Sequence, residues 1–217
     1  MKFENTEVWG FEHAIRGMRN PMNSWDSSDS GYIDKRFNDQ FYIGPNDLKL
    51  MKKLIKAGPE HRKFLRQIFI SVDITASLYW WKEFDTYKIG TVADSCSTMH
   101  KLKDTPITLD CFEIGDFADC NEESNHYNLY TKKIWSKLID HLEALRKEFN
   151  ETKDKRYWKE LIRLLPESWL QKRTVSMNYE NVANMYSQRM NHKLIEWSKY
   201  FIQWADELPY FKELFIV

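Results

Sequence analysis

One stretch, from Leu165 to Arg189, restricts the possible folds of this chain more than any other part of it. Its sequence is LPESWLQKRTVSMNYENVANMYSQR. Pro166 cannot continue a helix, and it disfavours helical geometry at the preceding leucine. The run from Lys172 to Met177 is then extended, and Asn178 is a good N-cap because its side-chain oxygen accepts a hydrogen bond from a free first-turn amide. The stretch therefore predicts a helix end, an extended segment and a new helix.

The new helix carries a candidate binding feature. Asn178 and Arg189 are eleven residues apart, close to three helical turns, so both are expected on about the same face. An exposed helix N-terminus with an arginine along that face is a natural anion site. The alternative is a capped helix with a surface arginine, since both features are common in proteins.

Composition limits the class of protein. A chain of 217 residues suits one large domain or two small ones. Acidic and basic residues balance at 32 each, which argues against general nucleic-acid affinity. Nine tryptophans and only seven glycines favour a helix-rich, well-packed protein. No apolar run approaches the roughly 18 residues of a membrane span, and the amino terminus lacks a secretory signal, so we expect a cytoplasmic protein without membrane partners.

The cysteines and histidines do not predict a metal site or a disulfide framework. Cys96, Cys111 and Cys120 are odd in number and form no C-x-x-C pair. Cys96 precedes His100 by four residues, but no third group that would orient such a pair is evident. The other histidines show no metal-ligand spacing.

Apolar periodicity in the first half predicts several elements. Residues 11–18 form a short amphipathic helix, and residues 20–46 form a polar loop or lid rich in Ser, Asp, Asn and Gly. A helix capped by Asn46 or Asp47 ends at Ala57-Gly58-Pro59. Residues 66–82 form one half-buried strand, or a strand followed by a helix from Ser77, and the pattern leaves both open.

The second half is predicted to be mainly helical. Residues 83–102 are polar with small side chains, and residues 103–126 form an acidic loop. Long amphipathic helices are expected at 129–149 and 155–164, and a last helix with a possible break runs to Leu208-Pro209. Their apolar stripes indicate core or subunit contacts.

The spacing of the first stretch resembles a known family. Pro166, Asn178, Asn184 and Arg189 follow one another at 12, 6 and 5 residues, as in the flavin-dependent thymidylate synthases of the ThyX type. The run IFISVDITASLYWWKEF is similar to the strand and helix that lead into that family's signature. His61 stands where the family has a flavin-contacting histidine, and AIRGMR at 14–19 is similar to an early family helix.

The chain departs from the family where positive charge is needed. The signature R-H-R-x-x-S-x-N-E-x-S-x-R-Y falls on residues 86–99, where Lys88 and Asp94 keep their counterparts' charge, Cys96 replaces a serine and Thr98 replaces an arginine that grips a nucleotide phosphate. Lys82-Glu83 replaces an Arg-Gln pair, and Glu180 stands in place of an arginine. Losing three charged contacts of about 1.5–3 kcal/mol each would weaken binding of a polyanion by more than roughly a thousandfold, unless other lysines or arginines rebuild the site.

The resemblance implies a specific fold and activity. It implies one ThyX-like α/β (α+β) domain over residues 1–217, with a small, mainly antiparallel central sheet flanked by long helices, assembled as a homotetramer. The implied reaction transfers a one-carbon unit from methylene-tetrahydrofolate to dUMP, with FAD as cofactor and NADPH as reductant. By resemblance, the cofactor-binding residues are His61, Lys88, Asp94, Asn178 and Asn184, and the substrate-binding residues are Lys82, Glu83, Cys96 and Arg189.

Several hypotheses stay open on the sequence alone. The chain is an active synthase, a divergent member that keeps the fold and a nucleotide-like ligand, or a non-enzymatic oligomeric interaction protein. Cys96 and Arg189 are the catalytic candidates; Cys96 is a nucleophile if Lys88 lowers its pKa, and otherwise a buried, inert thiol.

Overall fold

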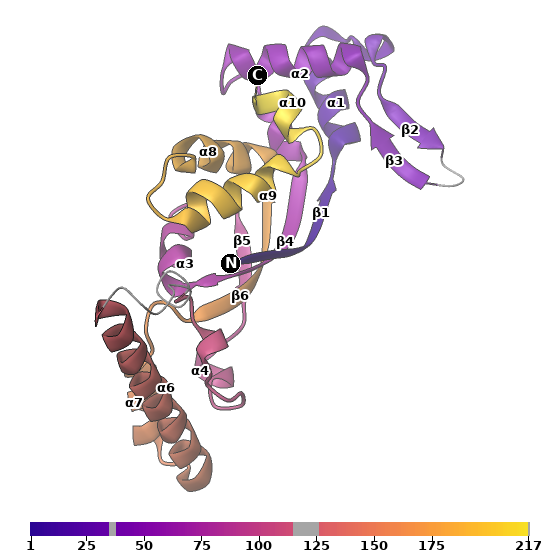
Figure 1. Cartoon of the computed structure of the whole chain (residues 1–217). Helices are drawn as coiled ribbons and strands as arrows, with labels where there is room; N and C mark the ends of the chain where they lie inside the picture. Colours follow the sequence, from indigo (N-terminus) through magenta and orange to yellow (C-terminus); the bar gives the residue numbers. More distant parts are fainter. Residues whose placement is uncertain (35–37, 115–125, 217) are drawn as a thin grey trace. The chain divides into compact units, whose positions relative to one another are not determined.

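The computed structural model describes residues 1–34, 38–114 and 126–216 (Figure 1). The contacts divide the chain into two compact units. The first unit comprises Met1–Lys2, Ile74–Thr86 and Asp94–Arg173, and the second comprises Phe3–Asp73, Tyr87–Ala93 and Thr174–Val217. Among the described residues, no helix is long and apolar enough to cross a membrane.

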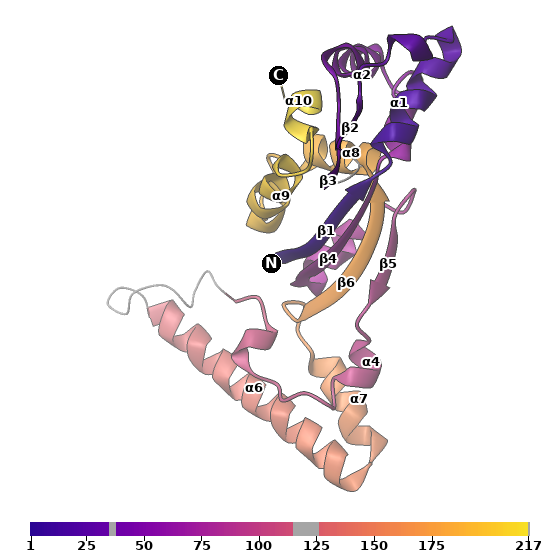
Figure 2. The same cartoon turned by 90° about the vertical axis from the view of Figure 1, so that its right-hand side faces the viewer.

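The central sheet has four strands in the order β1 (Lys2–Trp9), β4 (Phe69–Ser77), β6 (Leu170–Asn178) and β5 (Val92–Ser95) (Figure 2). The fold combines helices with an antiparallel sheet, as the sequence predicted. In β4, Ile70, Val72 and Ile74 are fully buried and alternate with partly exposed residues, because side chains alternate between the two faces of a strand. Helix α3 (Leu78–Phe84) follows directly, so the strand-then-helix alternative is the correct one.

The second unit is built around an aromatic core. Helices α1 (Phe11–Arg19) and α8 (Tyr179–Arg189) both pack on the 3₁₀ segment η3 (Lys63–Gln67). The ring of Tyr179 contacts Phe11 and Phe211 edge-on, and its hydroxyl donates to the carbonyl of Pro209 at 2.7 Å. Burial raises the pKa of Tyr179, so this phenol is a neutral part of the core.

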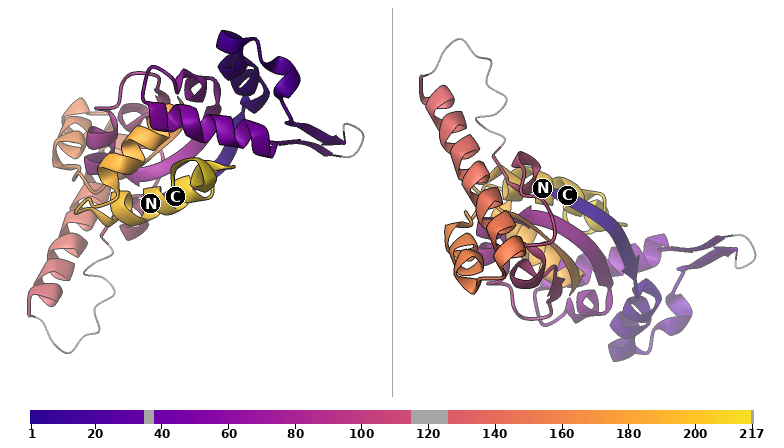
Figure 3. Two further views of the ribbon diagram at one scale, coloured as in Figure 1. Left: turned by 90° about the horizontal axis from the view of Figure 1, so that it is seen from above. Right: turned by 90° about the horizontal axis from the view of Figure 1, so that it is seen from below.

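The break that the sequence left possible in the last helix is present, because α8 ends at Arg189 and regular helical structure resumes only near Glu196. A π-helical turn (Glu196–Phe201) leads into α9 (Ile202–Asp206), and α10 (Phe211–Phe215) follows. Figures 1 and 3 show α9 beside α8. Trp197 and Phe201 are fully buried, so the irregular turn places two large rings in the core.

The segment 20–46 is not the plain polar loop that the sequence predicted. It contains two 3₁₀ turns, η1 (Asn20–Met22) and η2 (Trp25–Ser27), and a hairpin of β2 (Gly31–Asp34) with β3 (Asn38–Tyr42). Residues 35–37 lie outside the described part. The hairpin was not predicted, because its strands are short and the segment around them is rich in polar turn residues.

Helix α2 (Pro45–Ala57) begins earlier than predicted, and neither Asn46 nor Asp47 is its N-cap. The amides of both residues instead donate to the carboxylate of Asp29, at 2.8 and 3.1 Å. A side chain from another segment therefore caps the helix. The structure also explains Gly44 at the N-cap, because an added Cβ there would lie 2.2 Å from the Asp29 carboxyl carbon.

The first unit contains a helical hairpin. Helices α6 (His126–Thr152) and α7 (Lys155–Leu164) lie side by side in Figures 2 and 3, which confirms both predicted helices. Their shared core is made of Leu102, Ile107, Phe112, Ile139, Leu142, Leu145 and Leu161. Short helices α4 (Thr98–Lys101) and η4 (Leu109–Cys111) lie in the segment 83–114. The rest of the predicted acidic loop, with Cys120, lies mostly outside the described residues.

Candidate functional site

The start of α8 is a reciprocal cap. The side chain of Asn178 accepts from the amide of Asn181 at 3.1 Å, and the side chain of Asn181 accepts from the amide of Asn178 at 3.1 Å. This is a capping box built from two asparagines. The prediction of Asn178 as the N-cap is confirmed.

The loop 87–91 covers this helix end. Asn181 donates from its side-chain amide to the carbonyl of Ile89 at 2.7 Å. Gly90 has φ +79°, and a Cβ there would lie 3.0 Å from Asn181 Oδ1 and 3.1 Å from Asn178 Nδ2. Only glycine combines this backbone conformation with so close an approach. The structure therefore has the capped helix that the sequence offered as the alternative to an anion site.

The same loop reaches the last turn of α8. Arg189 donates from Nε to the hydroxyl of Tyr87 at 2.8 Å, and its guanidinium carbon lies 4.9 Å from the centroid of the Trp197 ring. Tyr87 donates in turn to Gln188 Oε1 at 3.0 Å. Contacts of one loop with both ends of α8 agree with the prediction that Asn178 and Arg189 share a face. Lys88 is exposed within this loop.

Two arginines that the sequence reasoning missed complete this face. Arg62 donates from Nε to Glu180 at 3.3 Å and from Nη2 to Asn184 Oδ1 at 3.1 Å. Arg66 donates to the other carboxylate oxygen of Glu180. His61 is an exposed turn residue whose amide donates to the carbonyl of Gly58, and its contact with a flavin stays a prediction. The sequence signal for Arg62 and Arg66 is the segment HRKFLR, which begins at His61.

This arrangement tests whether the α8 face fits FAD. Glu180 is only 7 % exposed, and a buried carboxylate is stable there because two guanidinium groups compensate its charge. All three arginines of this face (Arg62, Arg66 and Arg189) already contact a protein partner. A pyrophosphate would have to displace Glu180 or meet its repulsion. The α8 face therefore does not fit the diphosphate of FAD.

The first unit holds a cavity of about 540 Å³ beside Cys96 and Thr98. Gln171 organises its wall, because its side-chain amide donates to the carbonyl of Cys96 at 2.9 Å and to Thr98 Oγ1 at 3.2 Å. The amide of Cys96 donates to the carbonyl of Lys172 at 2.9 Å. Cys96 is exposed, so the expectation of a buried thiol is wrong.

The charge of this cavity is mainly positive. Lys2, Lys101 and Lys172 line it, against the single carboxylate of Asp110. Lys101 also lies 3.3 Å from Asp104 in an exposed pair, which water screens. Leu102, Trp169 and Leu170 add apolar wall. The cavity can therefore hold a small anion that also has an apolar or planar part. No pattern in the sequence pointed to Gln171 or Lys172, which lie on β6 before Asn178.

The remaining predicted residues stand apart from these two groups. Lys82 pairs with Glu167 at 2.6 Å on the surface, Glu83 is half-buried on α3, and Asp94 is exposed on β5. None of the three lines the cavity of the first unit. The structure thus groups Asn178, Asn184 and Arg189 along α8 in the second unit, with Lys88 exposed in the loop 87–91 of that unit. It places Lys82, Glu83, Asp94 and Cys96 in the first unit.

Comparison with known proteins connects this geometry to a fold. No family model matches the sequence, and no curated protein matches it. Two solved structures match over 100% of this chain and 98% of their own, each with a TM-score of 0.68, at 20% and 19% identity. Both are flavin-dependent thymidylate synthase ThyX from Helicobacter pylori, in complex with FAD and dUMP. The predicted resemblance is confirmed in the fold: the chain has the fold of the ThyX-type flavin-dependent thymidylate synthases.

Proposed function

We propose that this chain is a nucleotide-binding protein with the ThyX fold, whose ligand is a nucleoside monophosphate of the dUMP type held in the cavity beside Cys96. The observation that carries the proposal is the mainly positive lining of that cavity. Lysine attracts phosphate as a point charge and needs no bidentate geometry. The H. pylori proteins of the same fold bind dUMP.

Five of the residues that line the cavity have a role in this proposal. Lys101 and Lys172 neutralise the phosphate, and the apolar wall with Trp169 contacts the planar base. Gln171 holds the carbonyl of Cys96 and the hydroxyl of Thr98 in place at the cavity wall. The thiol of Cys96 lies at the cavity wall, where it can approach a bound base.

The same proposal separates nucleotide binding from flavin chemistry. Because Glu180 engages Arg62 and Arg66, the α8 face disfavours FAD, and the protein is a divergent member of the fold without thymidylate synthesis. We also propose a homotetramer, on the resemblance alone.

A second candidate function is the complete synthase reaction, in which FAD, NADPH and methylene-tetrahydrofolate supply the chemistry and His61, Lys88, Asp94, Asn178 and Asn184 bind the cofactor. Lys82, Glu83, Cys96 and Arg189 then bind the nucleotide. One observation favours it: Asn178, Asn184 and Arg189 keep the family spacing and are ordered along one helix.

Calorimetric titration with dUMP tests the proposal. We expect the wild type to bind, and the double variant Lys101→Ala/Lys172→Ala to bind at least tenfold more weakly. Lys147→Ala, an exposed lysine of α6 outside the cavity, is the matched control and should bind as the wild type does. Absence of dUMP binding by the wild type, or equal affinity in the double variant, contradicts the proposal.

The visible absorption spectrum, with and without added FAD, separates the two candidates. A protein that binds dUMP and stays colourless in excess FAD supports the divergent function. A stoichiometric flavin spectrum that dUMP shifts further supports the synthase, and assays with NADPH and the folate then follow.

A further inference from the structure

A second cavity, of about 260 Å³, lies in the second unit between α1 and the segment 25–32. The residues that decide its chemistry are Glu12, Arg16, Trp25, Tyr32 and Phe41. None of them belongs to the α8 face or to the cavity beside Cys96. Three aromatic rings and two opposite charges around so small a volume are an arrangement that packing alone does not require.

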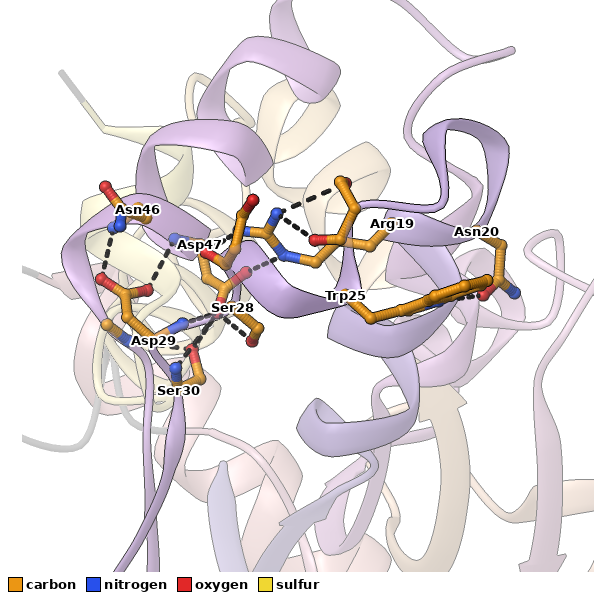
Figure 4. A network of polar contacts seen from close by, with 11 residues as sticks. Arg19, Asn20, Trp25, Ser28, Asp29, Ser30, Asn46 and Asp47 are labelled. Carbon is orange, nitrogen blue, oxygen red and sulfur yellow. Dashed lines mark hydrogen bonds and ion pairs between the residues drawn. The ribbon is translucent and has the colours of Figure 1, made fainter.

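The wall of this cavity is fixed by a buried ion pair, shown in Figure 4. Arg19 donates from Nε to Asp47 Oδ1 at 2.6 Å, and the two residues are 5 % and 0 % exposed. The other guanidinium nitrogens of Arg19 donate to the carbonyls of Ser24 and Ser27, each at 3.0 Å. One buried arginine therefore holds the ends of the turn that carries Trp25.

The second oxygen of Asp47 holds the following residues. Asp47 Oδ2 accepts from the hydroxyls of Ser28 and Ser30, at 2.6 and 2.7 Å, and from the amides of Asp29 and Ser30, at 3.1 and 3.2 Å. A buried ion pair adds little net stability compared with apolar residues, because both charges lose their hydration. Its effect here is to restrict the segment 24–30 to one conformation, as preorganised binding sites require.

The aromatic groups around the cavity are held in place although they are accessible. Trp25 is 49 % exposed, and its indole donates to Asn20 Oδ1 at 2.9 Å, which fixes the ring orientation (Figure 4). Tyr32 and Phe41 lie edge to face, with centroids 5.1 Å apart. Fixed, accessible rings stack on planar ligands at low entropic cost.

The charged side chains on α1 give the cavity a preference for ligands with an anionic group. Glu12 accepts from the hydroxyl of Tyr32 at 3.1 Å, so its carboxylate is already held by a neutral donor. Arg16, one turn further along α1, donates to His13 Nδ1 at 3.1 Å. In the described part of the chain, Arg16 thus contacts an imidazole nitrogen rather than a carboxylate, and its guanidinium can still pair with an anion in bidentate fashion.

We propose that this cavity binds a small aromatic carboxylate, with its ring against Trp25, Tyr32 and Phe41 and its acid group on Arg16. The volume of about 260 Å³ accommodates one ring or a fused pair of rings with a short acid substituent. The site is therefore distinct in both place and chemistry from the proposed nucleotide cavity.

The test is calorimetric titration of the full chain with benzoate, 4-aminobenzoate, orotate and indole-3-carboxylate, each up to 5 mM. We expect at least one acid to bind. Arg16→Gln should weaken that acid at least tenfold, and Trp25→Leu should weaken it as well. The carboxamide of the same ring should bind the wild type at least tenfold more weakly than the acid.

Arg156→Gln is the matched control, because its side chain is 91 % exposed on α7 in the other unit. It should leave the affinity unchanged. Far-ultraviolet circular dichroism checks that each variant is folded. The proposal is overturned if none of the four acids binds, if Arg16→Gln binds the acid as the wild type does, or if Arg156→Gln loses affinity equally.

Discussion

At the scale of single residues, Asp47 shows how one buried carboxylate can determine the conformation of a segment. It accepts from Arg19 with one oxygen and from Ser28, Ser30 and two backbone amides with the other. Burial alone would raise the pKa of Asp47, but hydrogen bonds from the two serines and Arg19 outweigh it and lower the pKa from its ordinary 3.8.

Asp47→Asn is expected to destabilise the protein by roughly 3–5 kcal/mol, because it leaves the buried Arg19 without its counter-charge. The wild-type contribution is fully present above the unfolded carboxyl pKa, and it is lost as pH falls through the lower folded pKa. Urea unfolding at pH 7 and pH 3 measures both effects. Asp26→Asn, at the exposed turn η2, is the control, and an equal loss in it would contradict the role given to Asp47.

Glu143 is a second carboxylate whose stability effect depends on pH. A hydrogen bond from Arg146, helped by the amide of Ile107 and opposed by burial, lowers its pKa from 4.5 to about 2. Glu143→Gln should therefore lower the free energy of unfolding by about 2–3 kcal/mol at pH 7. The difference from wild type should vanish as pH falls from 4.5 to 2. Glu148→Gln, exposed on the same helix, should change neither value.

On the α8 face, the carboxylate of Glu180 repels polyanions and engages Arg62 and Arg66. Glu180→Gln keeps a hydrogen-bond acceptor for Arg62 and Arg66 but removes its negative charge. The affinity for FAD, measured by quenching of flavin fluorescence, should rise at least tenfold, or about 1.4 kcal/mol. Glu207→Gln, an exposed acid of the same unit, controls for net charge. An unchanged affinity in Glu180→Gln would mean that the ion pair does not oppose FAD.

At the scale of elements, the loop 87–91 contacts both ends of α8. The loop contacts the cap through Ile89 and Gly90, and it contacts the last turn through Tyr87. This contact depends on the close approach of the Gly90 backbone to the side chains of Asn178 and Asn181, which a Cβ would crowd.

Gly90→Ala tests this contact. We expect a loss of about 2–3 kcal/mol in the free energy of unfolding, because the positive φ is strained for alanine and the Cβ meets the capping asparagines. Gly58→Ala is the control: Gly58 also has a positive φ, +108°, but nothing lies within 4 Å of its Cβ position. The free energy of unfolding should fall by at least about 1 kcal/mol less in Gly58→Ala than in Gly90→Ala. Equal losses would show that the close approach to α8 costs nothing.

The boundaries of the elements show how much local sequence can decide. Asp154 caps α7, Pro166 follows its end, and Asn178 opens α8, so these boundaries were predicted correctly. The start of α2 was not predicted correctly, because the amides of Asn46 and Asp47 are capped by Asp29, which lies 17 and 18 residues before them. The hairpin in segment 20–46 was missed for a different reason, because its strands are short and lie among polar turn residues.

At the scale of the whole molecule, charge is balanced. With 32 acidic and 32 basic residues, the net charge is zero and the isoelectric point is about 7.0. Proteins near zero net charge repel one another least. We therefore expect the solubility, measured by polyethylene glycol precipitation between pH 5 and 9, to be lowest near pH 7. A solubility that changes in one direction only across this range would contradict the expectation.

The sequence alone determined the helices α1, α6 and α7, the start of α8 at Asn178 and the resemblance to the ThyX fold, because caps, prolines and apolar periodicity act between residues a few positions apart. Only the tertiary structure decided what the site residues do. Arg62 meets Glu180 across 118 positions and Tyr87 meets Gln188 across 101, and no local pattern encodes such pairs. The cavity beside Cys96 and the one beside Arg16 exist for the same reason, since each wall is completed by residues distant in the chain.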